Sequence, residues 1–314
     1  MGTALVFPGQ GSQAVGMGKA LADAYPEAAL VFAEVDDALG EKLSAIIFDG
    51  PADALTLTRN TQPALMAVSI AALRALAGGA GPLPSSVTYL AGHSLGEYAA
   101  LAAAGSLTLA DTARLLRLRG EAMQRAVPPG EGAMAAILGL DADAVRDAAA
   151  EGSAPGELCE LANDNGGGQI VISGHTAAVE RAQAAARAKG ARRTVPLPVS
   201  GPFHSSLMAP AARDMADVLA GVAILPPSVP VVANVTARPH EDPEAIRRRL
   251  VEQITGTVRW RESVAWMSGA GVTRFVEIGA GKVLSGLVKR ISPDAETATV
   301  GTPDEVATVA PTLV

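Results

Sequence analysis

The sequence predicts an α/β fold with a large domain built on a mainly parallel sheet and a smaller domain inserted into it. Short apolar runs alternate with longer segments of helical periodicity over most of the chain, as in sheets whose strands are connected by helices. One of these runs ends in Gly-x-Ser-x-Gly, from Gly92 to Gly96, which lets a strand turn sharply into a helix. Residues 130–199 have a different order of elements, βαββαβ.

We therefore expect two domains. Residues 1–129 and 200–314 would form a hydrolase-like domain with a nucleophile elbow, and residues 130–199 an inserted ferredoxin-like domain. In the large domain the predicted strands are residues 3–7, 87–92, 229–234 and 273–278, with a short strand after residue 294. Its predicted helices are residues 19–39, 63–76, 109–126, 207–219, 243–255 and 260–268, and one that begins near residue 283. In the inserted domain the predicted strands are residues 133–140, 158–163, 169–173 and 192–199, and the predicted helices are residues 141–151 and 176–189.

Local signals support the individual elements. The unbroken apolar run at residues 3–7 predicts a buried strand, and the largely apolar segment 63–76 predicts a buried helix. Asp141 can cap the helix that follows it. The sequence Asp-Asn-Gly-Gly-Gly at residues 164–168 predicts a turn between two strands, and Gly201-Pro202 predicts a loop because it cannot continue a strand.

Composition excludes several classes of protein. The chain has 314 residues, of which 49% are hydrophobic and 18% charged, so a sizeable core is expected. The net charge of −7 argues against nucleic acid as a partner. The single cysteine, Cys159, excludes an internal disulfide and favours a reducing compartment, so we expect a cytoplasmic protein without a signal peptide or membrane span.

No cofactor or metal is expected. The glycine loop at residues 9–18 follows a predicted strand, but the third glycine of a dinucleotide-binding loop is replaced by Ala14. Gly281-Lys282 is followed by valine instead of the hydroxyl residue that a phosphate loop needs.

Ser94 lies at the tip of the glycine turn and is a candidate nucleophile. The turn exposes its hydroxyl, and the backbone N–H of Leu95, at the start of the next helix, can point at an anion formed beside it. The alternative is a strand-to-helix turn in which the serine only caps the helix.

Arg119 is anomalous in the predicted helix 109–126. It shares a helical stripe with Leu116 and Met123, whereas the other arginines of this helix lie on the opposite stripe. A guanidinium on an inward face must meet an anion. The anion is either a carboxylate of a ligand or a carboxylate of the protein in a structural salt bridge.

His204 and Gln10 are further candidates. His204 lies on the loop where the chain returns from the insertion to the domain that contains Ser94, and Gln10 presents an amide at the tip of the first glycine loop. Either could instead be an exposed loop residue.

Four separated segments resemble the acyltransferases of fatty acid and polyketide synthesis, and in particular the stand-alone bacterial malonyl-CoA:acyl carrier protein transacylases. They are Phe-Pro-Gly-Gln-Gly-Ser-Gln at residues 7–13, Gly-His-Ser-Leu-Gly-Glu-Tyr at 92–98, Arg-Leu-Arg-Gly at 117–120 and Gly-Pro-Phe-His at 201–204. The resemblance covers nearly the whole chain and includes Asn163 before the glycine turn of the insertion. It implies transfer of a malonyl group from malonyl-CoA to the phosphopantetheine thiol of acyl carrier protein in fatty acid synthesis, by a ping-pong mechanism through an acyl-serine.

The resemblance also implies roles for individual residues. Ser94 would be the nucleophile and His204 its general base, oriented by a backbone carbonyl that counting assigns to Gln253. Gln10 and the N–H of Leu95 would form the oxyanion hole. Three further residues would contact the substrate. Arg119 would bind the malonyl carboxylate, Asn163 would contribute to substrate binding, and Phe203 would be a bulky residue that favours malonyl over methylmalonyl. Phe203 could equally be a loop residue that only packs.

Other functions stay open at this point. The chain could be a trans-acting acyltransferase of polyketide synthesis, a serine thioesterase or hydrolase, or a docking module that has kept the fold without the activity. For the main interpretation, the expected partners are malonyl-CoA and holo-acyl carrier protein, with neither nucleic acid nor a membrane, and we expect a monomer.

Overall fold

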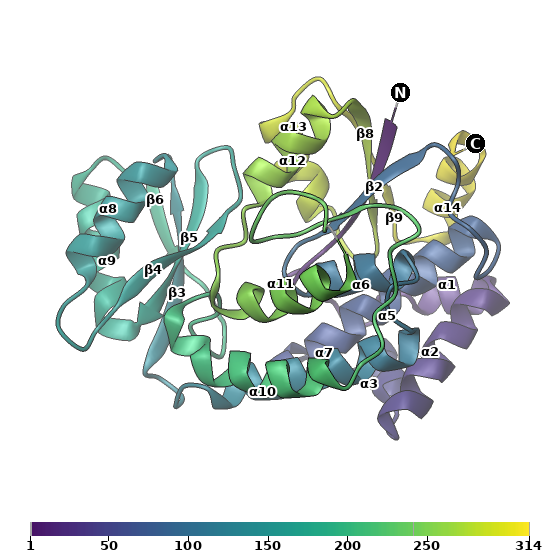
Figure 1. Ribbon diagram of the computed structural model, residues 1–314, viewed down its shortest axis with the longest axis horizontal. Coiled ribbons are helices and arrows are strands. Elements are labelled where there is room, and N and C mark those ends of the chain that lie inside the picture. The colour runs from purple at the N-terminus through teal and green to yellow at the C-terminus, as the bar shows by residue number, and fades with distance from the viewer. Residues whose placement is uncertain (1, 241, 314) are drawn as a thin grey trace.

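The computed structural model describes residues 2–240 and 242–313, which form a mixed α/β structure with two separate sheets (Figure 1). The larger sheet has five strands in the order β7-β2-β1-β8-β9, and every neighbouring pair is parallel. Its strands are β1 (Gly2–Phe7), β2 (Val87–Gly92), β7 (Val231–Val232), β8 (Val272–Ile278) and β9 (Glu296–Val300). The predicted parallel sheet is therefore confirmed.

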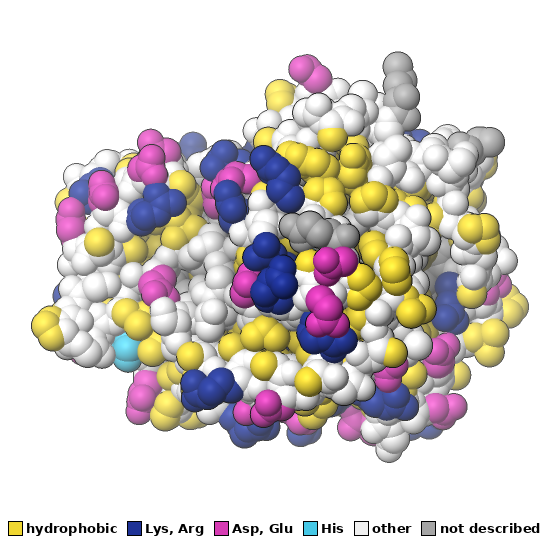
Figure 2. Space-filling view, in the orientation of Figure 1, with side chains coloured by type: hydrophobic (Ala, Val, Ile, Leu, Met, Phe, Trp, Pro, Cys, Tyr) yellow, Lys and Arg dark blue, Asp and Glu magenta, His cyan; other side chains and the backbone are white. Residues whose placement is uncertain are grey.

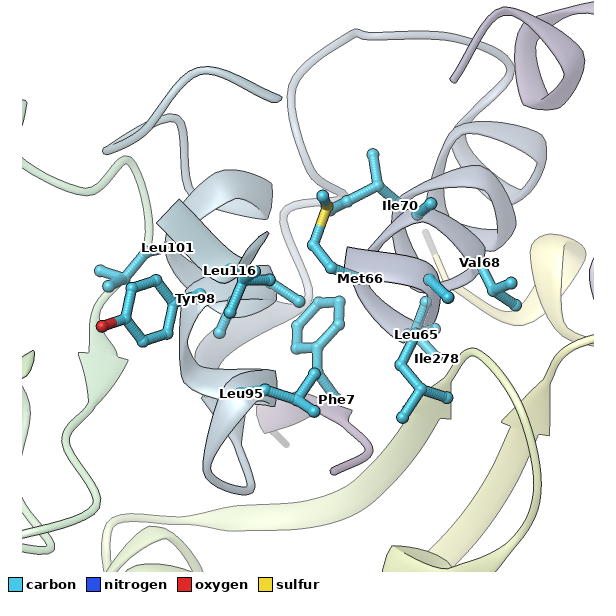
Figure 3. Close-up of a cluster of buried hydrophobic side chains, with 14 of the residues drawn as sticks. Phe7, Leu65, Met66, Val68, Ile70, Leu95, Tyr98, Leu101, Leu116 and Ile278 are labelled. Atoms are coloured by element: carbon cyan, nitrogen blue, oxygen red, sulfur yellow. The ribbon is translucent and has the colours of Figure 1, made fainter. Parts of the chain in front are cut away.

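Strand β1 lies at the centre and is buried on both faces. Ala4 and Val6 belong to one hydrophobic cluster, whereas Leu5 and Phe7 belong to another, as the two-residue period of a strand requires. Figure 3 shows Phe7 among side chains from the helices on its face of the sheet, including Leu65, Leu95 and Leu116. The apolar run of β1 thus joins two helical layers into one core.

Helices cover both faces of the larger sheet. The helices α12 (Trp260–Gly269) and α13 (Val283–Ile291) pack on the face of Ala4 and Val6. The other face is covered by a longer series: α1 (Lys19–Ala24), α2 (Pro26–Leu39), α5 (Thr58–Ala77), α6 (Leu95–Ala103), α7 (Leu109–Arg125), α10 (Ala209–Ala220) and α11 (Pro243–Thr255). As predicted, α5 is buried along most of its length.

The smaller sheet, at the left of Figure 1, is antiparallel, with the order β4-β5-β3-β6. Its strands are β3 (Gly132–Leu138), β4 (Cys159–Asp164), β5 (Gln169–His175) and β6 (Arg193–Pro196). Two helices, α8 (Ala142–Gly152) and α9 (Thr176–Ala188), pack on it and share a hydrophobic cluster with it. Asp141 caps α8 as predicted, because its side chain accepts a hydrogen bond from the N–H of Ala144.

Several elements differ from the sequence-based expectation. The predicted helix 19–39 breaks at Tyr25, because Pro26 cannot extend the helix before it and starts a new one. The short helices α3 (Leu43–Asp49), α4 (Ala52–Thr56) and α14 (Pro303–Val309) and the 3-10 turns η1 (Ser206–Met208) and η2 (Ala310–Thr312) were not predicted. Among the helices in the described ranges, none is long and apolar enough to cross a membrane.

Close packing of α7 on the start of α5 depends on Gly120. A Cβ at this position would lie 2.6 Å from the Cα of Arg59, which is backbone and cannot move aside. We expect Gly120→Ala to lower the free energy of unfolding by about 2 kcal/mol or more, measured by urea denaturation. The control is Gly286→Ala in α13, where a Cβ would meet no atom within 4 Å and should raise stability by up to about 1 kcal/mol. Equal effects of the two substitutions would contradict the packing argument.

Candidate active site

The turn between β2 and α6 holds Ser94 in a strained backbone conformation. Ser94 has φ 54° and ψ −111°, in the region that favours glycine. A Cβ on Gly92 would lie 1.9 Å from the carbonyl carbon of Gly96, and a Cβ on Gly96 would lie 2.2 Å from the carbonyl oxygen of Phe7. Both glycines are therefore required, because the turn folds back on itself and crosses the end of β1.

Asn234 fixes this turn from the neighbouring strand. Its side-chain oxygen accepts from the N–H of Ser94 at 2.7 Å, and its amide donates to the carbonyl of Gly92 at 2.6 Å. No sequence motif marked this residue as part of the site. The available signal was an asparagine at the end of the predicted strand 229–234, because polar side chains at the carboxyl ends of parallel strands face such sites.

The structure brings Ser94 and His204 together. The Ser94 hydroxyl lies 2.8 Å from Nε2 of His204, and Nδ1 of His204 lies 2.8 Å from the carbonyl oxygen of Gln253. Because a carbonyl only accepts, Nδ1 carries the proton, and Nε2 is left to accept from the serine hydroxyl. This is the tautomer that a general base needs.

Burial determines the protonation state of His204. Its side chain is 4% exposed. Desolvation, the nearby cation of Arg119 and the neighbouring His93 lower its pKa to about 3, against the opposing effect of the Gln253 carbonyl. The imidazole is therefore neutral near pH 7 and able to take a proton.

Arg119 is buried beside this pair, with 1% of its surface exposed. It donates from Nη1 to Gln62 at 2.7 Å, and from Nη2 to Gln253 Oε1 at 2.8 Å and to the Ser94 hydroxyl at 3.1 Å. Its buried Nε has no partner among the described residues. Within those residues no carboxylate is in direct contact with it, so a direct salt bridge does not explain its position.

A cavity of about 360 Å³ opens onto these groups. Its walls come from both sheets, since Met134 and Asn163 line it together with Ser94. The other residues singled out from the sequence also line the cavity, namely Gln10, Leu95, Arg119, Phe203 and His204. The exception is Gln253, which contacts His204 from behind. Its floor is polar and its walls are largely apolar, which suits a short acyl group with a charged end.

The two predicted oxyanion donors differ in how they are held. Leu95 is the first residue of α6, so its N–H belongs to the unpaired donors at the helix start. The amide of Gln10 has only a long contact of 3.5 Å with the hydroxyl of Thr58. Its side chain is therefore free to turn toward an anion in the cavity.

Comparison with known proteins agrees with this geometry. Residues 4–313 match the family model described as acyl transferase domain. The chain belongs to the acyl transferase family. It is 48% identical over 312 residues to the malonyl CoA-acyl carrier protein transacylase of Bacillus subtilis (strain 168), covering 99% of this chain and 96% of the relative. It is 47% identical to the transacylase of the same name from Escherichia coli (strain K12), with 97% of each chain covered.

Solved acyl transferase structures superpose closely on the chain. An acyl-carrier-protein-S-malonyltransferase from Bartonella henselae has a TM-score of 0.96 and 56% identity, covering 100% of this chain and 99% of that structure. A chain also matches in the solved structure described as a type II PKS acyl-carrier protein in complex with its malonyl-transacylase. The TM-score is 0.95 at 44% identity, and the match covers 99% of this chain and 100% of that chain.

The low pKa of His204 predicts an unusual pH dependence for Ser94. Only the neutral imidazole accepts the serine proton, so the rate of Ser94 modification by phenylmethylsulfonyl fluoride should stay nearly constant from about pH 8 down to about pH 5. Intact-mass measurements at fixed times give this rate, with Ser94→Ala as the unreactive control. A rate that halves near pH 6.5, the ordinary value for histidine, would contradict the assignment.

Proposed function

We propose that this chain transfers the malonyl group of malonyl-CoA to the phosphopantetheine thiol of acyl carrier protein in fatty acid synthesis. The observation that carries the proposal is Arg119, a buried guanidinium with no described carboxylate in direct contact, which donates a hydrogen bond to the hydroxyl of Ser94. A planar guanidinium binds a carboxylate in two places, and malonyl is an acyl group with a free carboxylate. The names of the relatives support the same reaction.

The geometry supports a two-step mechanism. His204 takes the proton of Ser94 as the serine oxygen attacks the thioester carbonyl, and the tetrahedral oxyanion is stabilised by the N–H of Leu95 and the amide of Gln10. Each such donor is worth about 3 kcal/mol. His204 then protonates the leaving CoA thiolate. In the second step it accepts the proton of the carrier thiol as the sulfur attacks the malonyl-serine ester, and it returns that proton to the serine oxygen as the ester bond breaks.

His204 is oriented by the carbonyl of Gln253, at 2.8 Å from Nδ1, and not by an acid. This contact favours the acyltransferase over a hydrolase with a Ser-His-Asp arrangement. The carbonyl restrains the ring without adding a negative charge to it.

We assign Phe203 and Asn163 to substrate selection. Phe203 is 6% exposed and adjoins His204, so its ring occupies wall space that a methyl branch on the acyl group would need. Asn163 is 6% exposed and lines the same cavity from the smaller sheet, where its amide can bond the thioester arm.

We further infer the domain arrangement from the two sheets. Residues 1–129 and 200–314 would form a hydrolase-like domain around the parallel sheet, and residues 130–199 an inserted ferredoxin-like domain. The strand order β4-β5-β3-β6 with two helices supports the second assignment.

The remaining inferences concern partners and location. Ser94, His204 and Arg119 meet within one chain, so the proposed chemistry does not call for a second copy, and we propose a monomer. Figure 2 shows basic and acidic side chains interspersed on one face, which together with the net charge of −7 disfavours nucleic acid as a partner. Cys159 is buried and unpaired, which suits the cytoplasm.

The reaction is tested with malonyl-CoA and the Ser94→Ala variant. The wild-type chain should gain one malonyl group by intact mass, the variant none, and CoA release should become continuous only when holo-carrier is added. Hydrolysis that ignores the carrier would indicate a thioesterase. Similarity to the PKS carrier complex favours polyketide synthesis as the alternative pathway, and kinetics with both carrier types would distinguish the two.

Arg119→Ala tests the source of selectivity. Loss of the charged hydrogen bonds to the malonyl carboxylate should slow acylation by malonyl-CoA about a hundredfold or more, whereas acylation by acetyl-CoA should persist or increase. Single-turnover acylation measures both rates. Arg114→Ala, an exposed arginine of the same helix, is the control and should change neither. Equal losses with the two donors would refute the selectivity role.

A further inference from the structure

A buried carboxylate that the proposed mechanism does not use lies beneath the Ser94 turn. Glu97, in the first turn of α6, is 0% exposed. Its Oε2 accepts from the N–H of Asn234 at 3.0 Å and from Nε2 of Gln253 at 2.7 Å, and its Oε1 lies 3.1 Å from Nε2 of His240. All of these groups can donate, so Glu97 needs no proton of its own to complete its hydrogen bonds. It is therefore an ionised group in the protein interior.

His240 does not cancel this charge. Its side chain is buried, and its Nδ1 has no partner among the described residues. A protonated ring would leave a charged N–H donor unpaired in the interior, whereas a neutral ring donates Nε2–H to Glu97 and leaves only a lone pair at Nδ1. The neutral form therefore costs less.

The opposite charge facing Glu97 belongs to Arg119. Gln253 joins the two, because its Oε1 accepts from Arg119 Nη2 at 2.8 Å while its Nε2 donates to Glu97 at 2.7 Å. Tyr98 also lies near both groups, but burial raises its pKa to about 12, so it is neutral. Glu97 and Arg119 are thus two opposite charges bridged by one amide and not in direct contact.

We propose that Glu97 is the resident counter-charge of Arg119 in the free enzyme and that it weakens the binding of the malonyl carboxylate. A buried guanidinium needs a compensating anion before any substrate arrives. The same anion repels an incoming carboxylate at Arg119, which keeps malonyl affinity low enough for transfer to the carrier. The inference rests on the proposed function.

Glu97→Gln isolates the charge from the hydrogen bonds. The amide oxygen would accept from Asn234 and Gln253, and the amide nitrogen would donate to Nε2 of His240 once that ring carries its proton on Nδ1. The hydrogen bonds of this side chain would be kept and its negative charge lost, at the cost of a neutral N–H without a partner at Nδ1 of His240 among the described residues.

The test measures dissociation constants of malonyl-CoA and acetyl-CoA by calorimetry, in a Ser94→Ala background that prevents turnover. Adding Glu97→Gln should tighten malonyl-CoA binding about tenfold and leave acetyl-CoA within about twofold. A purely structural role predicts weaker binding of both. Unchanged or weakened malonyl-CoA binding relative to acetyl-CoA would overturn the proposal.

Glu277→Gln is the control for removing a buried carboxylate outside the cavity, and it also removes one hydrogen bond from a backbone N–H. Glu277 is also 0% exposed, and it accepts from the N–H groups of Leu284 at 3.0 Å and Ser285 at 2.7 Å at the start of α13. It lines no part of the substrate cavity. Both dissociation constants should stay unchanged, and an equal tightening in the control would overturn the charge argument.

A measurement on the wild-type chain covers the case in which Glu97→Gln does not fold. Nitrogen-15 spectra of the imidazoles should show His240 as a neutral Nε2–H ring near pH 7. A His240 imidazolium would pair directly with Glu97 and overturn the proposal. If the wild-type chain forms no malonyl-serine, the proposed function itself fails; if it does and these results fail, only the role of Glu97 is lost.

Discussion

The hydrogen bonds of Gln253 hold the site in one arrangement. Its carbonyl accepts from His204 at 2.8 Å, its side-chain oxygen accepts from Arg119 at 2.8 Å, and its amide donates to the carbonyl of Ser94 at 2.9 Å. Gln253 lies in the last turn of α11, where backbone carbonyls lack a donor within the helix. The carbonyl is therefore free for the imidazole, and a single residue sets the positions of the proposed base, nucleophile and substrate anchor.

Two residues of the site adopt backbone conformations that are unfavourable for them. Ser94 has φ 54° and His204 has φ 57°, and each costs about 1–2 kcal/mol. The surrounding hydrogen bonds compensate: Asn234 accepts from the N–H of Ser94, and the hydroxyl of Ser205 donates to the carbonyl of Pro202. The strain aims both side chains into the same cavity, which an ordinary strand or helix backbone would not do.

The sequence was most informative where a local rule is broken. A serine between two glycines and an arginine on an apolar stripe each depart from the expected pattern, and both were identified from their own neighbourhood. His204 was a candidate from its position in the chain, but its role and the choice of Gln253 needed the family resemblance, because nothing local relates a loop histidine to a helix carbonyl 49 residues further along the chain.

The polar groups beneath the site, Asn234 and Glu97, were not recognised as parts of it. Asn234 ends the predicted strand 229–234, of which Val231–Val232 forms β7, and an asparagine at a strand end does not by itself mark a site. Glu97 occupies a helix position where a glutamate is usually solvated. Tertiary contacts alone bury these groups, as they also stabilise the short helices α3 and α4.

The loop that carries His204 is held from both sheets. Ser94 follows a strand of the larger sheet, whereas the loop after His204 is bound to the smaller one, because Glu160 of β4 accepts from the N–H of Ser206 at 2.6 Å. The far end of β4 pairs through backbone hydrogen bonds with Val258 of the larger part, at 2.9 and 3.0 Å. Glu160 thus holds the loop beside His204 from the smaller sheet, while the Gln253 carbonyl holds the ring of His204 from α11. The position of the imidazole therefore depends on contacts with both parts of the structure.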